Sequence, residues 1–197
     1  MTNLARFRSF IAATAHAVEA HHADEPALLA ALEPRLAELV AHDDWLPDEY
    51  AKPHPDFYRQ YLLYADPLDR WSVVSFVWGA GQRTPVHDHT VWGLVGVLRG
   101  AEVSTGYVEG ADGHLSAQPP QRIEAGDVVA VSPAIGDVHA IANAYADRTS
   151  ISIHVYGGNI GLIHRHVFDT TTGAARPFVS GYSNNTVPNL WAPAEAV

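Results

Sequence analysis

GQRTPVHDH, at residues 81–89, is the most informative stretch of the chain, and GDVH at residues 136–139 complements it. Side chains alternate between the two faces of a β-strand, so His87 and His89 are expected to point to the same side. If His139 converges on them from a second strand, three neutral imidazole nitrogens form part of a coordination shell. Such a ligand set suits a first-row transition metal and leaves coordination positions open for a substrate. The pattern therefore predicts a metalloenzyme.

Both segments belong to longer patterns that resemble the two sequence motifs of the cupin superfamily. In the first motif, glycines precede and follow a His-x-His pair, and here they are Gly81 and Gly100. Gly93 replaces the glutamate that usually completes this motif, so the usual shell of three histidines and one carboxylate becomes three histidines alone. The second motif is matched, with one additional residue on each side of the proline, by Gly126, Pro133, Gly136, His139 and Asn143. The resemblance implies a mainly β fold, the cupin barrel, also called a double-stranded β-helix or jelly-roll.

The chain is expected to form one domain with two parts. Residues 1–50 are predicted to be a helical segment packed on the barrel, because apolar residues recur there at helical spacing. Asp24 followed by Pro26 is typical of a helix start. Residues 51–197 are predicted to hold the cupin barrel and a C-terminal tail. Short runs rich in β-branched and aromatic residues predict strands near residues 71–78, 91–98, 128–131 and 151–156.

The composition excludes several kinds of partner and site. A formal net charge of −10 argues against binding to nucleic acids and to anionic membrane surfaces. No apolar run approaches the ~20 residues of a membrane-spanning helix. The chain has no cysteine, which rules out disulfides and thiolate ligands and agrees with a reducing compartment. A cytoplasmic location is expected, because His16 and Glu19 interrupt the apolar stretch after Arg6 and Arg8 and so argue against an export signal.

The segment ISIHVY, at residues 151–156, alternates apolar and polar side chains. Ser152, His154 and Tyr156 share one face of the predicted strand, and two interpretations of that face are open. Composition alone favours a half-exposed strand whose polar face meets solvent, as is common in antiparallel sheets. The alternative is a polar face that lines the barrel interior beside the metal. There the three side chains could form one hydrogen-bonded chain that makes the phenol a positioned proton donor.

Several motifs together resemble one group of cupins, the thiol dioxygenases, which includes cysteine dioxygenase and 3-mercaptopropionate dioxygenase. They are HDHT at residues 87–90 with the WG that follows, the motif around His139, and the S-x-H-x-Y pattern. The resemblance covers roughly residues 55–170. It implies a cupin with one non-haem Fe(II) that uses both atoms of O2 to convert a thiol to a sulfinate.

The resemblance also implies which residues carry this chemistry. The implied iron ligands are His87, His89 and His139, and the implied proton relay is Ser152, His154 and Tyr156. Three neutral imidazoles leave Fe(II) with its full positive charge, which favours binding and deprotonating a thiol at neutral pH. Mammalian-type members cross-link a cysteine to the relay tyrosine. That cross-link cannot form here, because the chain has no cysteine and carries Gly93 at about that position.

The expected substrate class follows from how the far carboxylate of a thiol acid would be held. In mammalian-type cysteine dioxygenases an arginine stands two positions after a tyrosine on an early strand, whereas here Gln60 follows Tyr58. This glutamine resembles the mercaptopropionate branch, in which an arginine on a later strand holds the carboxylate, and the matching residue is Arg165. A guanidinium offers a carboxylate a planar fork, whereas an amide offers weaker contacts. We therefore expect a small thiol carboxylate, preferably 3-mercaptopropionate, and O2 as substrates, with Tyr58, Gln60 and Arg165 in the binding site.

Other interpretations stay open at this point. Cysteine is an alternative substrate, and so is mercaptosuccinate, whose second carboxylate could recruit Arg83 or Arg99. A non-catalytic, ligand-sensing cupin would use its metal only for binding, although a sensor needs no proton relay. A hydrolytic or isomerising zinc cupin is a third hypothesis, because three histidines plus water also describe a catalytic zinc site. The sequence does not predict the oligomeric state.

Overall fold

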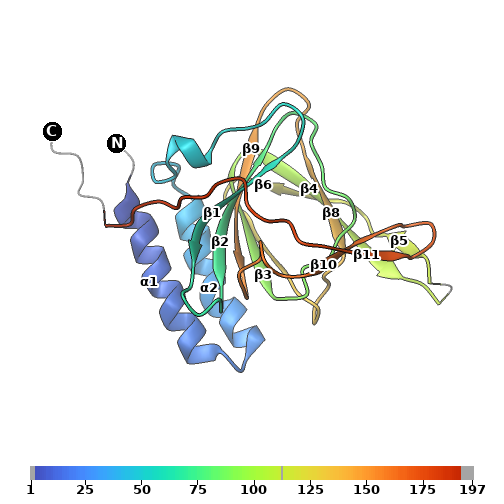
Figure 1. Ribbon diagram of the computed structural model, residues 1–197, viewed down its shortest axis with the longest axis horizontal. Helices are drawn as coiled ribbons and strands as arrows, with labels where there is room; N and C mark the ends of the chain where they lie inside the picture. The colour runs from blue at the N-terminus through green and yellow to red at the C-terminus, as the bar shows by residue number, and fades with distance from the viewer. Residues whose placement is uncertain (1–2, 112, 192–197) are drawn as a thin grey trace.

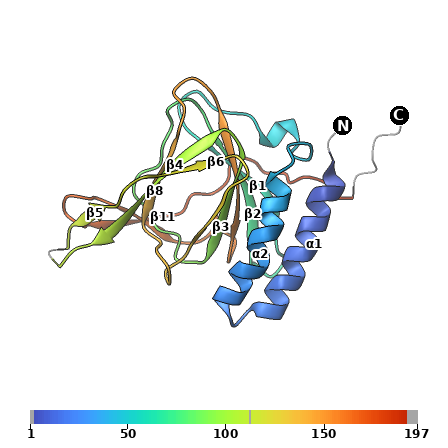
Figure 2. The same ribbon diagram turned by 180° about the vertical axis from the view of Figure 1, so that it is seen from behind.

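The computed structural model describes residues 3–111 and 113–191, in which two helices pack against a β-barrel (Figure 1, Figure 2). The helices come first in the chain: α1 (Leu4–His21), α2 (Glu25–Val40) and the short 3-10 helix η1 (Asp48–Tyr50). α1 and α2 lie side by side on one face of the barrel. Asp24 begins α2 as predicted, since its carboxylate accepts a hydrogen bond from the Ala27 N–H at 3.0 Å.

The barrel is made of antiparallel strands in two facing layers. The first layer is a five-stranded sheet in the order β1 (Arg59–Ala65), β2 (Ser72–Trp78), β9 (Ser150–Tyr156), β3 (Gly93–Arg99), β7 (Val128–Val131). The second layer contains β5 (Leu115–Ala117), β4 (Ala101–Glu109), β6 (Gln121–Glu124) and β8 (His139–Asn143). The hairpin of β10 (Arg165–Phe168) and β11 (Ala175–Phe178) completes the strands. The predicted fold class, a cupin barrel with an N-terminal helical segment, is confirmed.

Apolar cores lie on both faces of β9, and they determine where its polar side chains point. Ile151, Ile153 and Val155 belong to the core that the helices form with the outer face of the sheet. Tyr156 belongs to a second core inside the barrel, and all residues of β9 are buried. The interpretation that the polar face meets solvent is therefore wrong. The helices cover the outer face with apolar side chains, so the polar face of β9 turns into the barrel.

Close approach of α2 to the sheet depends on a glycine in β3. A Cβ atom at Gly96 would lie 3.0 Å from Leu36 Cγ and 3.0 Å from Val40 Cγ1. These distances are shorter than ordinary van der Waals contact, so any side chain here would push the helix outward. The close contact between α2 and the sheet excludes water from the outer face of β9.

The C-terminal segment, residues 179–191, runs from β11 along β1 to the start of α1 (Figure 1). Ser183 N–H donates to Gln60 O at 2.8 Å, and the Arg8 guanidinium lies 5.3 Å above the ring of Trp191. Residues 192–197 of the predicted tail lie outside the described residues. Within the described ranges, no helix combines the length and the apolar character that crossing a membrane requires.

Candidate metal centre

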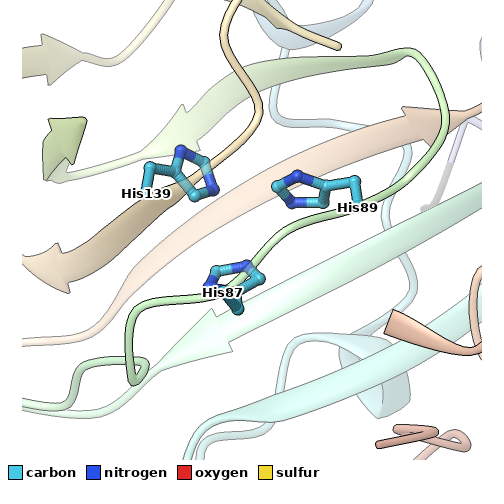
Figure 3. A group of neighbouring side chains, drawn as sticks. All are labelled: His87, His89 and His139. Carbon is cyan, nitrogen blue, oxygen red and sulfur yellow. The ribbon is translucent and has the colours of Figure 1, made fainter. Parts of the chain in front are cut away.

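The three motif histidines converge inside the barrel. The side chains of His87, His89 and His139 each offer one ring nitrogen, and these nitrogens all lie within 4.8 Å of one another. Figure 3 shows the three rings turned toward a common point. All three side chains are buried. In the part of the chain that the structure describes, this is the single group of three or more potential ligands of this kind.

His87 and His89 do not lie on a regular strand, contrary to the prediction. They belong to an irregular extended segment between β2 and β3. The expected orientation still holds, because His87 pairs with His139 through two reciprocal backbone hydrogen bonds of 2.9 and 3.0 Å. Asp88 points away from the site, as expected, and accepts hydrogen bonds from the backbone N–H and ring Nδ1 of His166 at 2.6 and 2.8 Å. His166 is therefore engaged outside the centre.

Each of the three histidines has a partner for its Nδ1 atom, which leaves Nε2 for a metal. Nδ1 of His87 lies 3.1 Å from Pro85 O, that of His89 2.9 Å from Asp137 Oδ1, and that of His139 3.5 Å from Ser104 Oγ. The Nε2 atom of His139 is buried and has no hydrogen-bond partner. A buried polar atom without a partner is costly, and a bound metal would satisfy it. The residues therefore fit a first-row metal ion.

Burial keeps two of the three candidate ligands, His87 and His139, free of protons. Removal from water lowers the pKa of His87 to about 3 and that of His139 well below its usual value. A neutral imidazole carries the lone pair that a metal needs, so no proton competes for these two side chains at neutral pH.

Asp137 orients His89 and was missed by the sequence analysis. Its carboxylate accepts hydrogen bonds from the backbone N–H groups of His89 at 3.0 Å and Thr90 at 2.9 Å, in addition to the ring of His89. Thr90 has a φ of 61°, a left-handed conformation that a β-branched residue rarely adopts. The position of Asp137 two residues before His139 is the signal that could have identified it.

The polar face of β9 forms one connected chain of hydrogen bonds beside the three histidines. Ser152 Oγ lies 2.7 Å from His154 Nε2, and His154 Nδ1 lies 2.7 Å from the Tyr156 hydroxyl. The Tyr156 ring stacks on the ring of His89 with centroids 5.4 Å apart. The Trp78 indole N–H donates to Ser152 Oγ at 3.2 Å at the other end. Burial lowers the pKa of His154 and raises that of Tyr156, so both are neutral near pH 7.

Gly93 lies directly against Tyr156, the tyrosine expected to end the relay. A Cβ atom at Gly93 would be 2.9 Å from Cδ1 and 3.0 Å from Cε1 of Tyr156. The ring of Tyr156 therefore occupies the space that a side chain would need at this position.

Of the three residues expected to bind substrate, Gln60 and Arg165 come from distant parts of the chain and share a partner. Arg165 Nη2 donates to Ser180 Oγ at 2.7 Å, and Gln60 Nε2 donates to the same oxygen at 3.0 Å. Tyr58 packs against Trp78 with ring centroids 4.9 Å apart. Ser180 belongs to the C-terminal segment and was not singled out from the sequence.

Arg165 is a buried cation without an anion. Its side chain is 3% exposed, its Nε atom has no hydrogen-bond partner, and none of the ion pairs found among the described residues includes it. Desolvation lowers its pKa, and its charge acts on the relay residue Tyr156 and on Tyr58. The two other arginines considered for a second carboxylate lie elsewhere. Arg99 pairs with Asp43 near the surface, and Arg83 lines a groove beside Val103 of β4 and Ala142 of β8.

Comparisons with known proteins add to this description. No family model matches the chain. The structure of an uncharacterized conserved protein with a double-stranded β-helix domain from Klebsiella pneumoniae is 22% identical, with a TM-score of 0.44 over 61% of this chain and 94% of that chain. A cupin superfamily protein from Desulfitobacterium hafniense is 17% identical, with a TM-score of 0.44 over 60% and 94%. Oxalate oxidase in complex with glycolate is 17% identical, with a TM-score of 0.45 over 56% and 57%. By its own topology and site, this chain is a cupin barrel with a candidate three-histidine metal centre.

Proposed function

We propose that the protein is a thiol dioxygenase, which holds one Fe(II) on His87, His89 and His139 and uses O2 to convert a small thiol carboxylate to its sulfinate. The observation that carries this proposal is the position of the relay. The Tyr156 ring stacks on the candidate ligand His89, and its hydroxyl forms the near end of a buried chain through His154 to Ser152. Bound iron would supply a Lewis acid for the thiolate and a site that activates O2.

The side chains around the centre supply the remaining parts of the reaction. Tyr156 would hold or move a proton at its hydroxyl oxygen, because His154 fixes that oxygen from behind at 2.7 Å. The buried aromatic side chains of the barrel, such as Phe76 and Trp78, exclude water and strengthen every charge interaction inside. A sensor that only binds a ligand would have no use for this relay.

Arg165 supports a carboxylate substrate. An isolated buried charge is costly unless it is paired, and a carboxylate would supply the missing anion. Because Arg99 and Arg83 lie elsewhere, one described cation faces the relay, which favours a monocarboxylate over mercaptosuccinate. Gln60 at the place of the arginine of mammalian-type enzymes favours 3-mercaptopropionate over cysteine. Cysteine and mercaptosuccinate are the alternative substrates in the assay.

The test is O2 uptake by iron-loaded protein with 3-mercaptopropionate, L-cysteine and mercaptosuccinate, with the sulfinate product quantified in the same samples. We expect one sulfinate per O2 consumed and the highest kcat/KM for 3-mercaptopropionate. Tyr156→Phe should keep its iron but lower kcat by roughly tenfold or more, as expected for loss of one preorganised donor. A zinc hydrolase or a sensor would consume no O2 with any of the three thiols, and that result would overturn the proposal.

The carboxylate contact is tested in the same assay. Arg165→Ala should lower kcat/KM for 3-mercaptopropionate by roughly 10- to 150-fold, mainly through KM, because a charge-assisted hydrogen bond is worth about 1.5–3 kcal/mol. Arg148→Ala, which removes an exposed arginine, is the matched control. An Arg165→Ala variant with an unchanged KM would remove Arg165 from the substrate site and leave the dioxygenase proposal standing.

A further inference from the structure

One buried acid has no role in the site described so far. Glu102 lies near the start of β4, is 0% exposed, and neither of its carboxyl oxygens has a hydrogen-bond partner. Burying a carboxyl group without partners costs several kcal/mol, more so when it is charged. A carboxyl group buried at this cost does not stabilise the fold, which makes Glu102 a candidate for a functional role.

Glu102 lies at the inner end of the proton relay. The Ser152 hydroxyl and the Trp78 indole lower the pKa of its carboxyl, although neither stands in hydrogen-bond geometry with it, and the indole itself donates to Ser152. Asn143 is its register partner on β8, but the Asn143 amide donates instead to backbone oxygens, including Trp78 O at 3.1 Å. The order of groups from the metal centre inward is therefore Tyr156, His154, Ser152, Glu102.

The other buried acids of the described residues are already engaged. Asp66 is paired with Arg70 at 2.9 Å. Asp88 holds His166, and Asp137, which is only partly buried, holds His89. Glu102 is thus the buried carboxyl that is free to accept a proton, and the relay leads to it.

A thiol acid that enters the site must lose its S–H proton inside a buried barrel. The three histidines would be engaged by the metal, and Gly93 stands where other cupins carry a carboxylate, so none of these residues can take it. We propose that Glu102 is the terminal proton acceptor of the relay and that it receives the proton of the substrate thiol. This inference rests on the proposed thiol dioxygenase function.

The transfer is balanced without any change of oxidation state. The S–H bond of the thiol breaks and gives a thiolate, and an O–H bond forms on the Glu102 carboxylate. Between them Tyr156, His154 and Ser152 each accept one proton and donate one, so none of them changes charge. The proton leaves to water when the sulfinate product departs as an anion.

The same transfer reverses the direction of the hydrogen bonds. With Glu102 ionised, Ser152 donates to it, His154 donates from Nε2 to Ser152, and Tyr156 donates to Nδ1 of His154. The Tyr156 oxygen can then accept the thiol proton. With Glu102 protonated, each bond runs the other way, and Tyr156 becomes a donor toward the anion in the site. Protonation of Glu102 therefore prepares Tyr156 to donate a hydrogen bond to the anion in the site.

The acidity of Glu102 suits this role. Burial raises its pKa to about 7, against the smaller opposing effects of Ser152 and Trp78. The relay residues His154 and Tyr156 stay neutral near pH 7, and the charged group that acts on both of them is Arg165. The register partners of Glu102, Asn143 on β8 and Ile123 on β6, do not titrate. An acid with a pKa close to the working pH both takes up and releases its proton readily.

The first experiment follows Glu102 by infrared spectroscopy in the metal-free protein, through the carbonyl band of a protonated, buried carboxyl group. We expect a band that disappears with a midpoint near pH 7 in the wild type and is absent in Glu102→Gln. Glu109→Gln, which removes an exposed acid of the same strand, should keep the band. A Glu102 that shows no protonated band at any pH between about 5 and 9 would overturn the inference.

The second experiment adds 3-mercaptopropionate without O2 to iron-loaded protein at about pH 8, where Glu102 starts ionised. The protonated carboxyl band should grow on thiol binding in the wild type. It should not grow in Ser152→Ala, which keeps Glu102 but interrupts the path. Ser152→Ala also keeps the inference falsifiable if Glu102→Gln does not fold.

Steady-state rates complete the test. We expect the wild-type kcat/KM to rise as pH increases through about 7, where Glu102 of the free enzyme ionises, and Glu102→Gln to lose this rise and tenfold or more of kcat/KM above it. Glu102→Asp, which restores a titrating carboxyl, should recover part of the rate. Normal sulfinate formation with no growth of the band would overturn the role of Glu102 and leave the dioxygenase proposal standing. Absence of thiol binding and O2 uptake in the wild type would instead overturn the proposed function, and this inference with it.

Discussion

Asp137 shows how one carboxylate can position a metal ligand. It accepts hydrogen bonds from the ring of His89 and from two successive backbone N–H groups, those of His89 and Thr90. These bonds hold Thr90 in a conformation that costs a β-branched residue about 1–2 kcal/mol. The carboxylate also fixes the tautomer of His89, so that Nε2 faces the other two histidines.

We predict that Asp137→Asn weakens metal binding by roughly 10- to 100-fold, because an amide would turn an N–H group toward at least one of the donors that Asp137 now accepts. Metal affinity is measured by titrating the metal-free protein with Fe(II) under anaerobic conditions. Asp56→Asn, at an exposed position, serves as the control. Equal affinities for Asp137→Asn and the wild type would mean that Asp137 only shapes the loop.

At this scale the sequence motifs identified the three histidines but not what orients them. The spacing around His87 and His89 is local and can be recognised from residue types. The bond from Asp137 to His89 joins positions 48 residues apart, so no local pattern contains it. Glu102 is hidden for a similar reason, since an acid in a strand is ordinarily interpreted as solvent-exposed.

The strand β9 shows what can and cannot be predicted for one element. The alternation in residues 151–156 correctly separates an apolar face from a polar face. It does not say which face meets solvent, because that depends on what covers the sheet. Here α1 and α2 cover the outside through residues such as Phe7 and Leu36, more than a hundred positions earlier in the chain. Composition alone therefore favoured the wrong environment, solvent, for the polar face.

The strand β8 ends in a residue that holds three elements together. The Asn143 side chain donates to Trp78 O at 3.1 Å and Arg148 O at 2.8 Å, and its Oδ1 accepts from Ser150 Oγ at 2.8 Å. It thus ties the ends of β2, β8 and β9 to one another. The cupin motif identified the position, but only the structure shows this structural role.

We predict that Asn143→Ala destabilises the protein by about 2–4 kcal/mol, because several buried backbone groups lose their partner at once. The melting temperature should fall by roughly 5 to 15 °C. Thermal unfolding followed by circular dichroism measures this, with exposed Asn185→Ala as the control. A fall no larger than that of the control would show that water replaces the lost bonds.

For the whole molecule, the barrel and its helical cover could be predicted, whereas the contacts between the C-terminal segment and the barrel could not. Periodicity predicted the helices, and the paired motifs predicted the barrel. Ser180 reaches Gln60 across 120 residues and is exposed, and serines on loops carry no signal of such contacts. Contacts of this kind depend on the completed fold.

The buried acid also makes the stability of the whole molecule depend on pH. The pKa of Glu102 is about 7 in the folded protein and 4.5 in its ordinary range. Between these values the folded protein holds a proton that the unfolded chain has released, so stability falls as pH rises through this window and levels off above about 7. The difference amounts to about 3 kcal/mol.

We predict that metal-free Glu102→Gln gains stability relative to the wild type as pH increases from about 5 to 8, because an amide has no ionisation cost. The gap in melting temperature between the two proteins should widen by roughly 5 to 10 °C over that range. Comparing the two proteins removes the contribution of all other titrating groups. A constant gap would show that Glu102 does not titrate within the folded protein.

The path of the C-terminal segment has a consequence for biosynthesis. The three candidate ligands have all left the ribosome once residue 139 has emerged, whereas Ser180, which joins Gln60 to Arg165, emerges much later. During translation all three candidate metal ligands are therefore available before Gln60 and Arg165 gain their shared partner. A chain that ends after β11 would keep all three candidate metal ligands but lack the hydroxyl group that joins Gln60 to Arg165.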